Sequence, residues 1–164
     1  MRLPIIVSAA LLTSVSLTAP VMSELPIQVV QLPAITNLNF EQLIINRRLW
    51  NQQNIYSYRY TLSRSCFCIP EARGPVVIEV RNGVTTSITS VDTGMPVNPE
   101  YFQKYDTVPK LFVLIRDAIA RGASNLSVQY DPILGYPTQI NIDYDSQIAD
   151  EEEYLTIENF EKIN

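Results

Sequence analysis

The chain contains no histidine, and this absence restricts its chemistry more than any other feature of composition. Without an imidazole, the chain supplies neither a Ser-His-Asp or Cys-His nucleophile system nor a histidine-based metal site. Only five glycines are present, and none forms a GxGxxG pattern or a phosphate-binding loop. These absences argue against the common hydrolases and nucleotide-dependent enzymes, and they favour a protein that is not an enzyme.

Positive charge is scarce as well. Lys and Arg number 12 against 17 Asp and Glu, which gives a net charge of −5. The imbalance is concentrated after residue 142, where eight acidic residues accompany Lys162 alone. Such a tail would repel the phosphates of a nucleic acid, so no nucleic-acid partner is expected.

The N-terminus is the longest stretch without charge. Arg2 precedes an uncharged, mostly apolar run over residues 3–19. A basic start, a short apolar core and small residues at its end are typical of a secretory signal peptide, which we predict over residues 1–23. A membrane anchor is the alternative, but the run is short for the roughly 20 residues that cross a bilayer. We therefore expect a secreted or periplasmic protein with no integral membrane span after cleavage. No cysteine lies near the cleavage point, so no lipid anchor is expected.

The remainder is long enough for one domain with a hydrophobic core. Residues 24–37 contain two prolines and show no clean period, so we predict an N-terminal arm or linker there and a single domain over 38–164. Asn39, with Gln42 three positions later, resembles a capping box and predicts a helix over 39–52.

Alternating apolar residues predict the strands. The first covers residues 56–68, and residues 76–81 pair with 84–90 around Asn82-Gly83, the strongest short hairpin pattern. After a loop, Asp106 or Thr107 caps a second helix, with Pro109 in its first turn and Gly122 just past its end. Further strands are expected over 126–130 and 140–144, and a short last strand over 154–160.

This order of elements is helix, three strands, helix, and two or three strands. Strands and helices do not alternate often enough for a doubly wound parallel sheet. The predicted fold class is α+β, with a single antiparallel sheet of five to six strands and both helices packed on one face.

Cys66 and Cys68, the only cysteines, end the first predicted strand. In an exported protein the default state is a disulfide. On an extended strand, positions i and i+2 stand about 6.5–7 Å apart, at the upper edge of disulfide reach, so the bond needs a local bend. Buried free thiols and a functional dithiol are the alternatives, the latter as a redox pair or a two-coordinate Cu(I) site.

Acidic side chains suggest two further sites. Asp143, Asp145 and Asp150 offer oxygen ligands for Ca²⁺, although the glycine and the final acid of an EF-hand loop are missing. A solvated turn is the simpler interpretation. A glycosidase pair could be drawn from Asp131, Asp143 and Glu79, but no spacing selects it.

Tyr56, Tyr58 and Tyr60 fall on one face of the first strand. The favoured interpretation is core packing with the hydroxyls at its rim, and the alternative is a face for a peptide or small-molecule ligand. Arg64 is the one charge on the apolar side of this strand.

A set of short motifs runs along the chain. They are Tyr56-Ser57-Tyr58, Cys66-Phe67-Cys68, residues 75–83, residues 107–112, Val128-Gln129-Tyr130-Asp131, Gly135-Tyr136-Pro137, Ile142-Asp143-Tyr144 and Asp150-Glu151. In this combination, over about residues 50–153, the sequence resembles the exported bacterial domain of unknown function number 6174. The resemblance implies an exported bacterial protein, with no activity and no catalytic residue to carry over. The lipid-attachment cysteine of some members is missing, which favours a soluble form.

Two functions follow as hypotheses. The first is a small exported binding or interaction module without catalysis, with a protein or small molecule as its ligand. The second is an extracytoplasmic thiol-disulfide or copper-handling protein that acts through Cys66 and Cys68.

Overall fold

The computed structural model describes residues 33–148 and 150–163, and the side chains from residue 38 onwards. The predicted signal peptide and the first part of the predicted arm lie outside the described residues.

The first helix, α1, spans Pro33–Gln52 and begins earlier than the sequence pattern predicts. Proline is well tolerated in the first turn of a helix, where a backbone N–H has no intrahelical acceptor. Asn39 is therefore inside the helix and not its cap, and its side-chain amide donates a hydrogen bond to the carbonyl of Leu126. Leu43, Asn46 and Trp50 form the buried side of α1, at spacings of three and four, whereas Phe40 is exposed.

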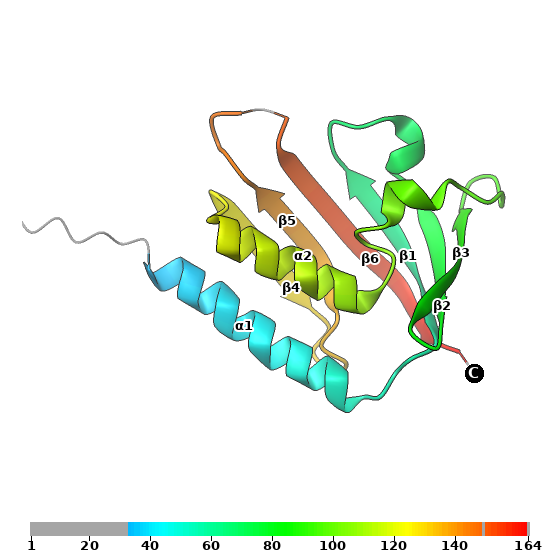
Figure 1. Cartoon of the computed structure of the whole chain (residues 1–164), viewed down its shortest axis with the longest axis horizontal. Helices are drawn as coiled ribbons and strands as arrows, with labels where there is room; N and C mark the ends of the chain where they lie inside the picture. The colour runs from blue at the N-terminus through cyan, green and yellow to red at the C-terminus, as the bar shows by residue number, and fades with distance from the viewer. Residues whose placement is uncertain (1–32, 149, 164) are drawn as a thin grey trace, which may run out of the picture. The chain divides into compact units, whose positions relative to one another are not determined.

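Six strands form one antiparallel sheet, as Figure 1 shows, in the order β3-β2-β1-β6-β5-β4. The strands are β1 (Tyr58–Ser65), β2 (Val76–Arg81), β3 (Val84–Ser90), β4 (Asn125–Tyr130), β5 (Pro137–Asp143) and β6 (Glu152–Lys162). The β2–β3 hairpin turns at Asn82 and Gly83, which have φ values of 52° and 79°, as a type I′ turn requires. The predicted hairpin and the predicted α+β class are both confirmed.

The last strand, β6, differs most from its prediction. It is 11 residues long and lies in the middle of the sheet, between β1 and β5. The apolar alternation is carried by buried Leu155 and Ile157 and is then interrupted at Asn159, whose φ is 51°. The irregular pairing there turns Phe160 back into the core, against Trp50. An interruption of this kind hides a long strand from a period-2 search.

The second helix, α2 (Val108–Arg121), follows its prediction closely. The Thr107 side chain accepts a hydrogen bond from the backbone N–H of Lys110, and Gly122 ends the helix with a φ of 68°. The buried residues of α2 follow helical spacing and are Val108, Leu111, Phe112, Ile115 and Ala118. Both helices lie on the same face of the sheet, and the other face is left uncovered by the described elements (Figure 1). None of the helices in the described part of the chain is long and apolar enough to cross a membrane.

Candidate functional site

The cysteine pair lies just beyond the end of β1, which stops at Ser65 and not at Cys68 as predicted. The backbone N–H of Cys68 donates a 2.9 Å hydrogen bond to the carbonyl of Cys66, which closes a three-residue turn around Phe67. The turn shortens the distance between the two Cα atoms to 5.3 Å, and the sulfurs are joined in a disulfide. The local bend that the sequence required is therefore this turn.

The chain after the disulfide is fastened back to the strand. A short helical turn, η1 (Pro70–Ala72), leads to Arg73. The Arg73 guanidinium donates two hydrogen bonds to the carbonyl of Cys68, at 3.1 and 2.8 Å, and the Arg73 carbonyl accepts one from the backbone N–H of Arg64 at 2.6 Å. We call residues 66–73 the disulfide loop. Its conformation is set by one covalent bond and by hydrogen bonds at both ends.

Glycine is required where the disulfide loop returns to the sheet. Gly74 has a φ of +82°, and a Cβ atom there would lie 2.7 Å from the backbone oxygen of Leu62. Any larger residue would meet backbone and not a flexible side chain, so the close approach of the loop to β1 depends on this position.

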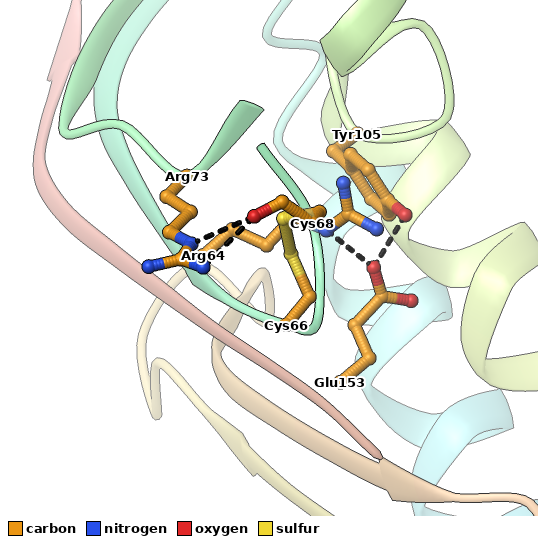
Figure 2. The surroundings of a disulfide bond; sticks show 6 residues. All are labelled: Arg64, Cys66, Cys68, Arg73, Tyr105 and Glu153. Atoms are coloured by element: carbon orange, nitrogen blue, oxygen red, sulfur yellow. Dashed lines mark hydrogen bonds and ion pairs between the residues drawn. A yellow bond between two sulfur atoms is a disulfide. The ribbon is translucent and has the colours of Figure 1, made fainter. Parts of the chain in front are cut away.

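An ion pair underlies the disulfide loop (Figure 2). Arg64 Nε lies 2.6 Å from Glu153 Oε1, and these side chains are only 18% and 12% exposed. The Tyr105 hydroxyl donates a hydrogen bond to the same oxygen, and the Arg64 guanidinium carbon lies 4.9 Å from the centre of the Tyr105 ring. Burial first, and then the bond to Glu153, raises the pKa of Tyr105 well above its usual value. Tyr105 therefore stays protonated and acts as a donor to the carboxylate.

The disulfide loop exposes two large apolar side chains, and a hollow lies on each side of Phe67. Phe67, at the tip of the turn, is 81% exposed, and Ile69 is exposed as well. A hollow of about 200 Å³ is lined by Ser65, Cys66, Phe67, Asp150, Glu152 and Tyr154. A second, of about 380 Å³, is lined by Phe67, Cys68, Ile69 and Arg73. The Phe67 ring borders both hollows, so a partner that covers it would contact both.

The three tyrosines predicted as one face are divided by the structure. Tyr56 is 63% exposed, whereas Tyr58 and Tyr60 are each 1% exposed. The Tyr58 hydroxyl accepts a hydrogen bond from the backbone N–H of Val108, and the Tyr60 hydroxyl donates one to the carbonyl of Tyr105. The alternative of an open ligand face is thus wrong for Tyr58 and Tyr60. Both side chains hold the start of α2 against the sheet.

The predicted calcium ligands are not brought together. Among the residues that the structure describes, no three acidic or cysteine side chains gather closely enough to hold a metal ion. The Asp145 carboxylate instead accepts a hydrogen bond from the backbone N–H of Gln147. The predicted two-coordinate Cu(I) site requires both cysteines as thiolates, and both sulfurs are committed to the disulfide.

The candidate glycosidase carboxylates also lie apart. Glu79 is on β2 and Asp143 on β5, and two strands separate these in the sheet. Three strand spacings amount to about 14 Å, whereas paired glycosidase carboxylates stand about 5–9.5 Å apart. Asp131 accepts hydrogen bonds from the backbone N–H groups of Ile133 and Leu134, which is a role in a turn.

Glu153 is the residue that sequence reasoning missed. In the sequence Glu153 is one member of an acidic stretch, whereas Arg64 is the one charge on the apolar face of its strand. Arg64 pairs with Leu155 on β6, and Glu153 is two residues before Leu155 and so on the same face of the sheet. The strand register therefore brings the side chains of Arg64 and Glu153 together. The lone arginine was the available indication that a buried acid must face it.

Comparison with known proteins adds one match. The model of a family described as "Family of unknown function (DUF6174)" matches residues 42–162. Neither the curated proteins nor the solved structures contain a match.

Proposed function

We propose a function for this chain, which belongs to the DUF6174 family of unknown function. The proposed function is that of an exported binding module without catalysis. Its disulfide loop would present Phe67 to an apolar segment of a partner protein. The observation that carries this proposal is the 81% exposure of an aromatic ring at the tip of a covalently closed turn.

Exposure of Phe67 has an energetic meaning. Full burial of such a side chain is worth about 1.5–3 kcal/mol, and aromatic residues are enriched among those that dominate binding energies. Ile69 and Tyr154, both exposed beside the hollows, extend the apolar area.

Rigidity of the disulfide loop supports the same proposal. A flexible loop loses conformational entropy when a partner orders it, and this loss weakens binding. Here the disulfide, the Arg73 bonds to the Cys68 carbonyl and the buried Arg64–Glu153 pair order the loop beforehand.

Crosslinking tests the site directly. A photoreactive benzoyl-phenylalanine at position 67 should yield discrete adducts in cells of the source organism. Position 133 is the matched control, because Ile133 is 74% exposed and lies in the β4–β5 turn. Phe67→Ala should weaken binding of a partner identified in this way about 10- to 100-fold. Absence of adducts at position 67, or the same adducts at both positions, would contradict the proposal.

Export is part of the proposal and has its own test. The uncharged run after Arg2 and a disulfide between the only two cysteines both suit an oxidising compartment outside the cytoplasm. Sequencing of the N-terminus of the natural protein should show that it begins at Glu24. A retained Met1 in a cytoplasmic fraction would refute this.

Thiol-disulfide exchange is a second candidate, because Cys66 lines one of the surface hollows. A thiolate of a partner dithiol would attack one sulfur, break the S–S bond and form a mixed disulfide while the other sulfur leaves as a thiolate. The second partner thiol would then release this protein as a dithiol and leave the partner oxidised. Only that reduced form would offer Cu(I) two thiolates.

Thiol counting separates the two candidates. The cysteines are titrated by alkylation after equilibration in glutathione buffers of about −180 to −210 mV. Exchange predicts a mixture of reduced and oxidised protein, unchanged in Phe67→Ala. A pair that stays fully oxidised at these potentials eliminates exchange and leaves the binding module.

A further inference from the structure

A second hollow lies along α2, away from the disulfide loop. Five of its lining residues share one face of the helix at spacings of three and four: Lys110, Val113, Leu114, Asp117 and Arg121. Lys104 and Tyr144 complete the wall. The volume is about 300 Å³, at the lower end of the range for small-molecule sites. We call this hollow the α2 pocket.

The charge of the α2 pocket is opposite to that of the protein. Lys104, Lys110 and Arg121 line it with a single carboxylate, Asp117, in a chain whose net charge is −5. Asp117 is held 2.9 Å from Arg116. Lys110 lies 2.6 Å from Asp106, while Lys104 has no hydrogen bond or ion pair among the described residues. The pocket therefore favours an anion.

Arg121 is held in a defined orientation. Its guanidinium carbon lies 3.9 Å from the centre of the Tyr144 ring, so the planar group stacks on the aromatic face. Stacking leaves the edge N–H groups of a guanidinium available, and these match the two oxygens of a carboxylate. Apolar Val113 and Leu114 lie in the same wall.

We propose that the α2 pocket binds a small organic carboxylate with an apolar body. The carboxylate would take the edge of Arg121, and the body would lie on Val113 and Leu114. Lys104 and Lys110 would add to the positive charge of the pocket. This site is independent of the disulfide loop, and neither proposal depends on the other.

Phenylacetate is a suitable probe, with phenylacetamide as its uncharged isostere. Titration of ¹⁵N-labelled full-length protein should shift the amide resonances of residues 110–121 and 144 with phenylacetate, and at least tenfold more weakly with phenylacetamide. Equal binding of both compounds, or no shifts at millimolar phenylacetate, would overturn the proposal.

Variants test the individual contacts. Arg121→Gln should weaken phenylacetate binding about tenfold, and Arg121→Lys should recover only part of it, because lysine keeps the charge but loses the planar fork. Lys104→Gln should weaken phenylacetate binding as well. Lys104 is exposed and has no described hydrogen bond or ion pair, so this change should leave folding intact. Lys162→Gln is the matched control, since it removes one positive charge from β6. If Lys162→Gln weakens binding as much as Arg121→Gln, the attraction is nonspecific and the proposal fails.

Discussion

Replacement of Glu153 by glutamine tests whether the Arg64–Glu153 pair stabilises the folded protein. The change keeps the shape of the side chain and an oxygen that can accept from the Tyr105 hydroxyl. It removes the negative charge that lies 2.6 Å from Arg64. Arg64 then remains charged at a site where its side chain is only 18% exposed.

The magnitude follows from this burial. Loss of one partner of a fully buried pair costs about 3–5 kcal/mol because the other charge is left uncompensated. Arg64 keeps some contact with water and its position over the Tyr105 ring, so we expect a smaller cost than for a fully buried pair, about 2–3 kcal/mol. Glu153→Ala also deprives the Tyr105 hydroxyl of its acceptor and should cost about 1 kcal/mol more.

Urea denaturation at neutral pH measures the effect as a fall in the midpoint at constant slope. The matched control is Glu161→Gln, which breaks the pair with Arg59, where the side chains are 56% and 49% exposed. That change should cost less than about 1 kcal/mol. The double variant Arg64→Met with Glu153→Met should regain most of the stability, since no charge is left buried.

Two results would refute the reasoning. One is a cost for Glu153→Gln no greater than for Glu161→Gln, which would mean that the pair is solvated. The other is a double variant as unstable as Glu153→Gln alone, which would mean that an unpaired charge was not the cause.

Three further predictions concern the core. Burial raises the pKa of Tyr58 to about 12 and also raises that of Tyr60, whereas an unfolded tyrosine ionises near pH 10. As pH rises, the unfolded state therefore loses these protons before the folded state does. The free energy of unfolding should be unaffected below pH 10 and should fall between about pH 10 and 12. Urea midpoints measured across this range should fall less steeply for Tyr58→Phe. Gly135→Ala should lower the melting temperature, measured by circular dichroism, far more than Gly94→Ala. Both glycines have positive φ, but only at Gly135 would an added Cβ atom meet backbone, at 2.5 Å from the Asn46 carbonyl oxygen. Tyr60→Phe should cost about 1–2 kcal/mol in urea, since the Tyr105 carbonyl loses its donor.

Several elements could be predicted because their determinants are local. Asn82-Gly83 specifies a tight hairpin by its backbone preferences alone, and Thr107 with Gly122 delimits α2 through hydrogen bonds within a few residues. The start of α1 could not be predicted from its pattern. Asn39 resembles a cap in sequence, but its amide is used by β4, at a distance of 87 residues along the chain.

The candidate site was predicted only in its covalent part. The expected export favoured a disulfide over free thiols, and the cysteine spacing required a bend for it; both are present in the disulfide loop. The hollow beside Cys66 is completed by Asp150 and by Glu152 and Tyr154 of β6, which no local pattern relates to the cysteines. The α2 pocket likewise combines a helix face with Tyr144, beyond the end of β5.

The sequence by itself determined the element types, the hairpin, the fold class and the cysteine pair, since these depend on side-chain period and on short-range backbone preference. Only the tertiary structure decided that β6 lies at the centre of the sheet, and with it the register that sets Glu153 against Arg64. Pairing of distant strands is chosen by the burial of whole faces and not by any one segment. For that reason the support beneath the disulfide loop became visible only once the sheet was assembled.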